Sequence, residues 1–237
     1  MDWTYKNFVI HEFLELESTN KTAVELASLG KIFDRELILA KQQSAGRGRR
    51  NRDWISPAGN LYFSLVLRPK IELEKIPQLS FVAIAALRLA VKNSMVKWPN
   101  DLLIEEKKVA GLLLESKISE KNCEFVVIGI GINLTSHPSE TIFPASNLEN
   151  FGIKISPPEM LKKFLDEFEI LYQNWLDFDF AGIRQIWLQR AYRLNEKVKL
   201  KLDGKEVEGV FSGIDGEGNL LLNREEKILK ISVADVS

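Results

Sequence analysis

The chain has 237 residues, of which 45% are hydrophobic, and its 32 Lys and Arg residues nearly balance 33 Asp and Glu residues. This length allows one large domain and one small one, with enough apolar residues for a packed core. A nearly neutral charge argues against a protein that binds nucleic acid along its surface, because such proteins are usually basic. The single cysteine, Cys123, excludes an internal disulfide and favours a reducing compartment.

The sequence shows no sign of export or of a membrane span. Residues 1–6 lack the basic start and apolar core of a signal peptide. No apolar run approaches the ~20 residues that a helix needs to cross a bilayer. We therefore expect a cytoplasmic protein with no membrane partner.

Apolar periodicity and turn residues predict the elements of the first third of the chain. In order, we expect a strand at 8–16, a helix between 18–20 and Gly30, strands at 36–41 and 61–67, and a helix at 76–91. Ser18, Thr19 and Asn20 precede the first helix. Their hydroxyl and amide groups either cap that helix or hold a polar ligand group at its N-terminus.

A segment rich in Gly and Arg follows the strand at 36–41: Gly46-Arg47-Gly48-Arg49-Arg50-Asn51-Arg52-Asp53-Trp54. Glycines allow tight turns and a close approach of backbone N–H groups, and guanidinium groups clamp phosphate or carboxylate oxygens. Trp54 adds a flat apolar face for a ring. In a neutral chain this segment favours a small anionic ligand with an aromatic base; a solvated turn or a nucleic-acid patch are the alternatives.

The middle of the chain predicts a short strand that ends at Pro99, turns at Asn100-Asp101 and again at 105–107, and two further strands. These strands are expected at 108–115 and 125–134. Gly129 and Gly131 alternate along the second strand, so they lie on one face of it. That face is either the floor of a pocket or a site of tight packing or a bulge.

The last part of the chain predicts a loop, two helices and then a change to short strands. The loop covers 135–150, the first helix begins at Ser156 and runs to Trp175, and the second covers 180–192. Short strands joined by Asp-Gly turns then predict a small all-β module of SH3 size. They are expected at 197–202, 206–214, 220–222 and 227–233.

Five segments occur in an order and spacing that resemble the biotin protein ligases. They are 18–20, 43–50 with Trp54, 97–102, 108–111 and 129–133, and the β module adds a Gly-Ile-Asp-x-x-Gly stretch at 213–218. The resemblance covers nearly the whole chain. It implies an α+β fold with a mixed sheet backed by helices, similar to class II synthetases, and a C-terminal SH3-like barrel. We expect a catalytic biotin- and ATP-binding domain at 1–191 and the barrel domain at 192–237, where the barrel helps to hold ATP or the acceptor.

The family joins the carboxylate of biotin to the α-phosphate of ATP, which gives biotinyl-5′-AMP and pyrophosphate. It then transfers biotin to a lysine of a biotin carboxyl carrier protein. Because two anions must meet in the first step, positive charge is needed between them. The resemblance assigns this catalytic role to Lys108, Arg47 and Arg49, although Lys108 taken alone is an ordinary lysine at a strand end.

The resemblance also implies the binding residues. The biotin site comprises Ser18, Thr19, Asn20, Gln43, Gly46, Arg47, Gly48, Lys108, Gly111, Gly129 and Gly131. The ATP or adenylate site comprises Arg47, Gly48, Arg49, Trp54, Lys97, Asn100, Lys108 and Asn133, and Trp54 covers the ligand when its loop closes. Asp101, otherwise a turn residue, is the candidate for Mg²⁺, which binds through few carboxylates plus phosphate oxygens.

Two residues depart from the family pattern. Asn51 stands where a glycine is frequent, and Asp53 where a basic residue is common. Asparagine tolerates left-handed backbone, whereas Asp53 removes positive charge beside the site. The resemblance suggests a homodimer, and the residues before Ser18 leave no room for a helix-turn-helix, so we expect no DNA partner. The alternatives are a lipoate–protein ligase or related acyl transferase, and a non-enzymatic nucleic-acid-binding protein.

Overall fold

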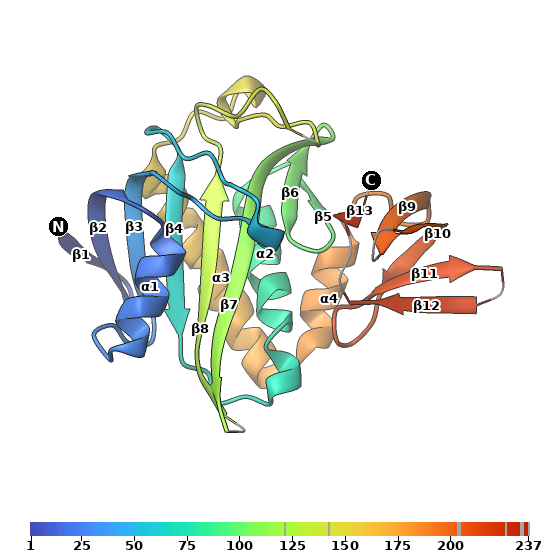
Figure 1. Cartoon of the computed structure of the whole chain (residues 1–237), viewed down its shortest axis with the longest axis horizontal. Coiled ribbons are helices and arrows are strands. Elements are labelled where there is room, and N and C mark those ends of the chain that lie inside the picture. Colours follow the sequence, from blue (N-terminus) through green and yellow to red (C-terminus); the bar gives the residue numbers. More distant parts are fainter. Residues whose placement is uncertain (121, 142, 203–204, 226, 233–234, 237) are drawn as a thin grey trace.

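An eight-stranded sheet spans the first domain of the computed structural model (Figure 1). The structure describes residues 1–120, 122–141, 143–202, 205–225, 227–232 and 235–236. The strands are β1 (Asp2–Tyr5), β2 (Phe8–Leu16), β3 (Glu36–Gln43), β4 (Leu61–Leu67), β5 (Met95–Lys97), β6 (Asp101–Ile104), β7 (Lys107–Ser119) and β8 (Asn122–Ile132). Their order is β1-β2-β3-β4-β8-β7-β6-β5.

The sheet is mixed, as predicted. Helix α1 (Thr19–Ser28) connects β2 to β3, which run parallel because such a crossover returns the chain to the same end of the sheet. The other neighbouring strands pair antiparallel. The end of β2 and the start of α1 therefore lie at the same edge of the sheet as the end of β3.

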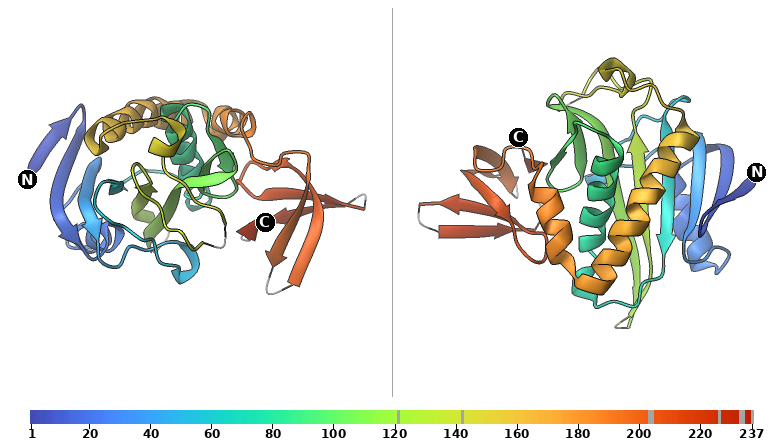
Figure 2. Two further views of the ribbon diagram at one scale, coloured as in Figure 1. Left: turned by 90° about the horizontal axis from the view of Figure 1, so that it is seen from above. Right: turned by 180° about the vertical axis from the view of Figure 1, so that it is seen from behind.

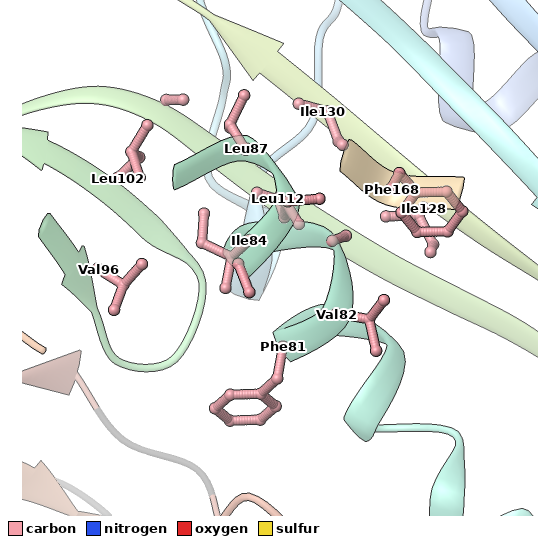
Figure 3. Packing of buried hydrophobic residues seen from close by; sticks show 14 of the residues in the cluster. Phe81, Val82, Ile84, Leu87, Val96, Leu102, Leu112, Ile128, Ile130 and Phe168 are labelled. Atoms are coloured by element: carbon pink, nitrogen blue, oxygen red, sulfur yellow. The ribbon is translucent and has the colours of Figure 1, made fainter. Parts of the chain in front are cut away.

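Helices cover the two faces unequally (Figures 1 and 2). Helices α2 (Gln78–Ala90), α3 (Pro157–Phe178) and α4 (Phe180–Leu188) lie behind the sheet, and α1 alone packs on the front. In β8, Ile128 and Ile130 face the larger core, which Figure 3 shows between α2 and the strands. Phe125 and Val127 face α1. The same alternation puts Gly129 and Gly131 on the α1 face.

The C-terminal residues form a separate five-stranded antiparallel sheet, consistent with the expected SH3-like barrel. Its order is β12-β11-β10-β9-β13. The strands are β9 (Lys197–Leu202), β10 (Lys205–Ile214), β11 (Leu220–Arg224), β12 (Lys227–Ile231) and β13 (Asp235–Val236). This module lies beside β5, at the end of the large sheet opposite the N-terminus (Figure 1). Among the described helices, none combines the length and apolar character needed to cross a membrane.

Most predicted elements are confirmed, with three short strands missed. β1 and β13 are brief outer strands, and β6 lies between two turns, so each is too short for a periodic pattern. The helix expected at 180–192 ends at Leu188. Residues beyond it pair with β5 instead: the Val96 amide donates to the Arg190 carbonyl, and the Tyr192 amide donates to the Val96 carbonyl, both at 2.8 Å.

Candidate functional site

The N-terminus of α1 points its polar side chains at the front of the sheet. Ser18 is extended, and its hydroxyl accepts a hydrogen bond from the Lys21 amide at 3.4 Å, so it caps the helix. Thr19 and Asn20 are buried and turn inward. The capping interpretation is therefore confirmed for Ser18, whose two neighbours belong to a polar cluster on the sheet. The binding of a polar ligand group by this segment stays a prediction.

This polar cluster consists of Thr19, Asn20, Gln43, Ser56 and Ser64. Gln43 Oε1 accepts from the Thr19 amide at 2.8 Å and from its hydroxyl at 3.1 Å. Ser64 Oγ lies 2.9 Å from Thr19 Oγ1 and 2.6 Å from Asn20 Oδ1, and Gln43 Nε2 donates to Ser56 Oγ at 2.8 Å. These mutual bonds fix the orientations of the side chains, which are buried except for the half-buried Gln43. Ser64 was not predicted, although it is the one small polar residue within its apolar strand.

The glycines make room for side chains of the site. A Cβ on Gly129 would lie 2.0 Å from Asn20 Oδ1, and one on Gly131 would lie 2.3 Å from Trp54 Nε1. At Gly111 a Cβ would approach both Trp54 and Lys108 at about 3.1 Å. Tight packing is thus confirmed at these glycines, with the Trp54 indole lying against Gly131. That this face, called the glycine floor below, forms the floor of a ligand pocket stays a prediction.

The segment 46–54, called the Arg loop below, folds back on itself. Trp54 N–H donates to the Gly46 carbonyl at 2.9 Å, and Gly48 N–H donates to the Arg52 carbonyl at 2.7 Å. The backbones of Arg47 and Asp53 pair as an isolated antiparallel β-bridge across the loop. Asp53, which departs from the family pattern, therefore lies within the turn. The non-glycine residue in the left-handed region is Arg50 (φ 54°), next to Asn51.

Two arginines of the Arg loop reach across to the sheet. Arg47 Nη2 lies 3.5 Å from Glu115 Oε1, and the other oxygen of that carboxylate accepts from Asn20 Nδ2 at 2.8 Å. Arg49 donates to Asn100 Oδ1 at 3.4 Å. Glu115 was missed by the sequence analysis. Its signal was the even spacing from Gly111, which puts both residues on the α1 face of β7.

Lys108 lies between the Arg loop and β6. Its Nζ is 2.7 Å from Asp101 Oδ1 and 5.2 Å from the Trp54 ring. Its backbone is held on both sides, because its amide donates to the Pro144 carbonyl at 2.7 Å and its carbonyl accepts from Ser146 at 2.9 Å. With 26% of its side chain exposed, Lys108 is not an ordinary solvated lysine.

The residues expected to bind the nucleotide surround Lys108 and Asp101. Lys97 is buried, and its Nζ lies 3.5 Å from the centre of the Phe143 ring, another contact that was not predicted. Asn100 Nδ2 donates to the Leu112 carbonyl, and Asn133 Nδ2 donates to the Ser146 carbonyl at 3.0 Å. These amides fix backbone segments on either side of Lys108. Asp101 begins β6 and is not simply a turn residue.

The carboxylates near Lys108 limit how Mg²⁺ could bind. Within the described parts of the chain, no three His, Cys, Asp or Glu side chains form a group that could hold a metal ion. Asp101 is a lone carboxylate paired with Lys108. Mg²⁺ is usually bound by one or two carboxylates together with substrate phosphates. Asp101 therefore fits an ion that arrives with a nucleotide, but not a site formed by protein alone.

Two family models match the chain. Residues 13–133 match the Biotin/lipoate A/B protein ligase family, and residues 194–237 match the Biotin protein ligase C terminal domain. The first stretch contains all five segments that carried the resemblance. The second contains the Gly-Ile-Asp-x-x-Gly stretch of the β module.

Relatives and solved structures point the same way. The chain is 40% identical over 223 residues to the biotin--[acetyl-CoA-carboxylase] ligase of Paracoccus denitrificans, covering 87% of this chain and 90% of that protein. It is 36% identical to the bifunctional ligase/repressor BirA of Bacillus subtilis, covering 98% and 74%. The biotin protein ligase of Aquifex aeolicus in complex with biotin and ATP superimposes with a TM-score of 0.79 at 28% identity, covering 96% and 97%.

Proposed function

The chain belongs to the biotin/lipoate A/B protein ligase family and is a biotin protein ligase, and from this premise we propose how its residues divide the reaction. It is an enzyme that uses ATP to activate biotin and then joins biotin to a protein. The observation that supports the division is the position of Lys108. It lies beside the glycine floor, with the Arg loop on one side and Asp101 on the other.

In the first half-reaction, a carboxylate oxygen of biotin attacks the α-phosphorus of ATP. The bond to the β-phosphate breaks, and pyrophosphate leaves with the electron pair. We propose that Lys108 offsets the repulsion between the two anions and stabilises the charge on the phosphoryl oxygens. Arg47 and Arg49 then hold the phosphate of biotinyl-5′-AMP, while the Trp54 indole covers the reactive anhydride and excludes water.

We propose that the polar cluster recognises the bicyclic head of biotin. Thr19, Asn20 and Gln43 of the cluster, together with the neighbouring Ser18, supply hydrogen-bonding groups. Gly46, Gly48, Gly111, Gly129 and Gly131 allow the flat ligand to approach the backbone. Ser64 supports this site, because its hydroxyl lies within hydrogen-bond distance of both Thr19 and Asn20. Side chains that mutual hydrogen bonds already hold in place lose little further conformational freedom when a ligand binds.

The nucleotide half of the site comprises Lys97, Asn100 and Asn133. Asp101 would hold a Mg²⁺ ion, which would neutralise phosphate charge. In the second half-reaction, a neutral lysine amine of a biotin carboxyl carrier protein attacks the anhydride carbonyl. The carbon–oxygen bond to AMP breaks, AMP leaves, and the amine loses a proton. The proposed acceptor follows from the family and from the matched carboxylase ligase.

We propose a homodimer that uses the outer half of β7. β6 pairs with β7 only as far as Gly111. In the part of the chain that the structure describes, the edge from Leu113 to Ser119 carries no further strand on that side. An open strand edge can pair with its own copy about a two-fold axis. Sedimentation that gives a monomer at micromolar concentration, with and without biotin and ATP, would contradict this proposal.

The remaining expectations stay proposals. The single cysteine supports a cytoplasmic location, which cell fractionation tests. The boundary between the domains is proposed at residues 191 and 192, close to the start of the second matched family model at residue 194.

ATP–pyrophosphate exchange with biotin, with lipoate and with neither ligand tests the function. We expect exchange only with biotin, and a loss of at least about 100-fold in Lys108→Ala, as for other groups that stabilise transition-state charge. Lys75→Ala is the matched control, because Lys75 also pairs with a carboxylate, Asp179 at 3.6 Å, but is neither in the proposed site nor on the outer edge of β7. Exchange with lipoate alone would change the substrate, and no exchange would overturn the proposal.

A further inference from the structure

A single turn of the C-terminal module, residues 214–218, is bound by three elements of the first domain. Its carbonyl groups accept one hydrogen bond from each of three side chains. Arg184 of α4 donates to the Ile214 carbonyl at 2.6 Å, and Gln78 of α2 donates to the Gly216 carbonyl at 2.8 Å. Trp98 donates to the Gly218 carbonyl at 3.0 Å. We call this segment the docking turn.

The docking turn is rigid as well as bound. Asp215 Oδ1 accepts from the backbone amides of Glu217 and Asn219 at 3.0 and 2.9 Å, which closes the turn from inside. Gly218 has a φ of +85° and lies so close to α2 that a Cβ would be 2.4 Å from the Phe81 ring. Such a turn has little freedom to shift along the first domain.

The bond to Trp98 connects the docking turn with the nucleotide half of the site. Trp98 is buried and follows Lys97 directly, and the same short connection continues to Asn100 and Asp101. Arg49 contacts this connection through Asn100. A shift of the Trp98 ring would therefore move the groups proposed to bind ATP, but it would leave the polar cluster on β3 and β4 in place.

We propose that the docking turn is a positioning element for ATP, and that Trp98 is its contact residue. This inference rests on the proposed function of the site. It goes further because it assigns the C-terminal module a specific role, in which the Gly218 carbonyl fixes the connection from Lys97 to Asp101. A purely structural role would alter stability or all kinetic constants together, whereas positioning alters the constant for one substrate.

Trp98→Phe tests the proposal because it removes the indole N–H and keeps an aromatic ring. We expect the KM for ATP in the exchange assay to rise roughly threefold to tenfold, as for one lost hydrogen bond with a buried acceptor. The KM for biotin should stay within about twofold, since the polar cluster is untouched. Arg184→Leu removes the hydrogen bond to the Ile214 carbonyl, which holds the docking turn without touching the connection from Lys97 to Asp101. It should shift the KM for ATP in the same direction.

Trp187→Phe is the matched control. Trp187 is equally buried at the same domain contact, 6.3 Å from Phe211 of the module, but its Nε1 has no hydrogen-bond partner in the described structure. It should leave both KM values unchanged. The inference would be overturned if Trp98→Phe changed the KM for ATP and the KM for biotin equally, or if neither Trp98→Phe nor Arg184→Leu changed either constant. In both cases an active wild type would still support the proposed function. A wild type without biotin-dependent exchange would instead remove the function.

Discussion

Two glycine-containing loops from different domains contact the same short connection between β5 and β6. The Arg loop reaches Asn100 through Arg49, and the docking turn holds Trp98 through the Gly218 carbonyl. The Arg loop contacts the sheet with long charged side chains, at 3.4 Å to Asn100 and 3.5 Å to Glu115. The docking turn uses backbone carbonyls at 2.6 to 3.0 Å.

Glycine permits tight packing in both loops, because a Cβ would lie 2.4 Å from the Trp54 carbonyl at Gly46 and 2.4 Å from the Phe81 ring at Gly218. The loops differ in the groups that reach the connection: charged side chains from the Arg loop and a backbone carbonyl from the docking turn. One loop is suited to closing over a reactive intermediate, and the other to holding a fixed reference point beside it.

The largest effect should come from Gly131→Ala. Its Cβ would meet the Trp54 indole at 2.3 Å, and we expect this side chain of the Arg loop to shift away from the glycines. We expect biotin-dependent exchange to fall about 100-fold, as for a misplacement of about 1 Å in an active site. The melting temperature should change little. Gly182→Ala is the control, because a Cβ there meets nothing within 4 Å. A large loss of stability would show that Trp54 is fixed.

Gly218→Ala, in contrast to Gly131→Ala, should mainly reduce the stability of the protein. The new methyl group would lie 2.4 Å from the buried Phe81 ring at a φ of +85°, and neither side can move easily. We expect about 2 to 3 kcal/mol of destabilisation from overpacking and backbone strain. Gly216→Ala in the same turn meets nothing within 4 Å and should be nearly neutral. Similar urea midpoints for the two variants would contradict a tightly packed docking turn.

The pH dependence of stability should identify Asp215 as the internal brace of the docking turn. Burial alone would raise the pKa of Asp215, but hydrogen bonds from Asn219, Lys230 and the Glu217 amide outweigh it and lower the pKa from 3.8 to about 2. A carboxyl group with a depressed folded-state pKa stabilises above its unfolded value and loses that contribution as the pH falls. Asp215→Asn should cost about 2 kcal/mol at neutral pH.

Thermal unfolding of both proteins across this range checks the sign. The difference between wild type and Asp215→Asn should be constant above pH 3.8 and shrink as the pH approaches 2. A difference that grows on acidification would mean that Asp215 is not held as a carboxylate.

The smallest effect is expected for Glu115→Gln, which weakens the contact between the Arg loop and Asn20. The amide keeps the shape of the side chain but loses the charge that attracts Arg47 at 3.5 Å. We expect biotin to dissociate roughly threefold to tenfold faster in stopped-flow experiments. Glu124→Gln, which removes the partner of Lys117 at 3.0 Å, should leave the rate unchanged. Identical rates in all three proteins would argue that the Arg loop closes without Glu115.

The fold was largely predictable because local patterns determine it. Period-two alternation put Gly129 and Gly131 on one face, and the Asp215-Gly216 turn marked the hairpin of β10 and β11. The contacts that complete the site were not predictable. Ser64 meets Thr19 across 45 residues, Glu115 meets Asn20 across 95, and Trp98 meets Gly218 across 120. Such pairs are set by the order of strands and the docking of domains, which no short segment encodes.

Residues 214–218 leave the ribosome after every strand of the large sheet, and N-terminal domains generally fold first during synthesis. The residues proposed to bind biotin, on α1, β3, β7 and β8 and in the Arg loop, are thus all synthesised while the partner of Trp98 is still missing. If the docking turn positions ATP, an unfinished chain can hold the vitamin without efficiently activating it. Full affinity for ATP then begins only when the second domain has folded, so a reactive acyl adenylate is produced mainly by completed molecules.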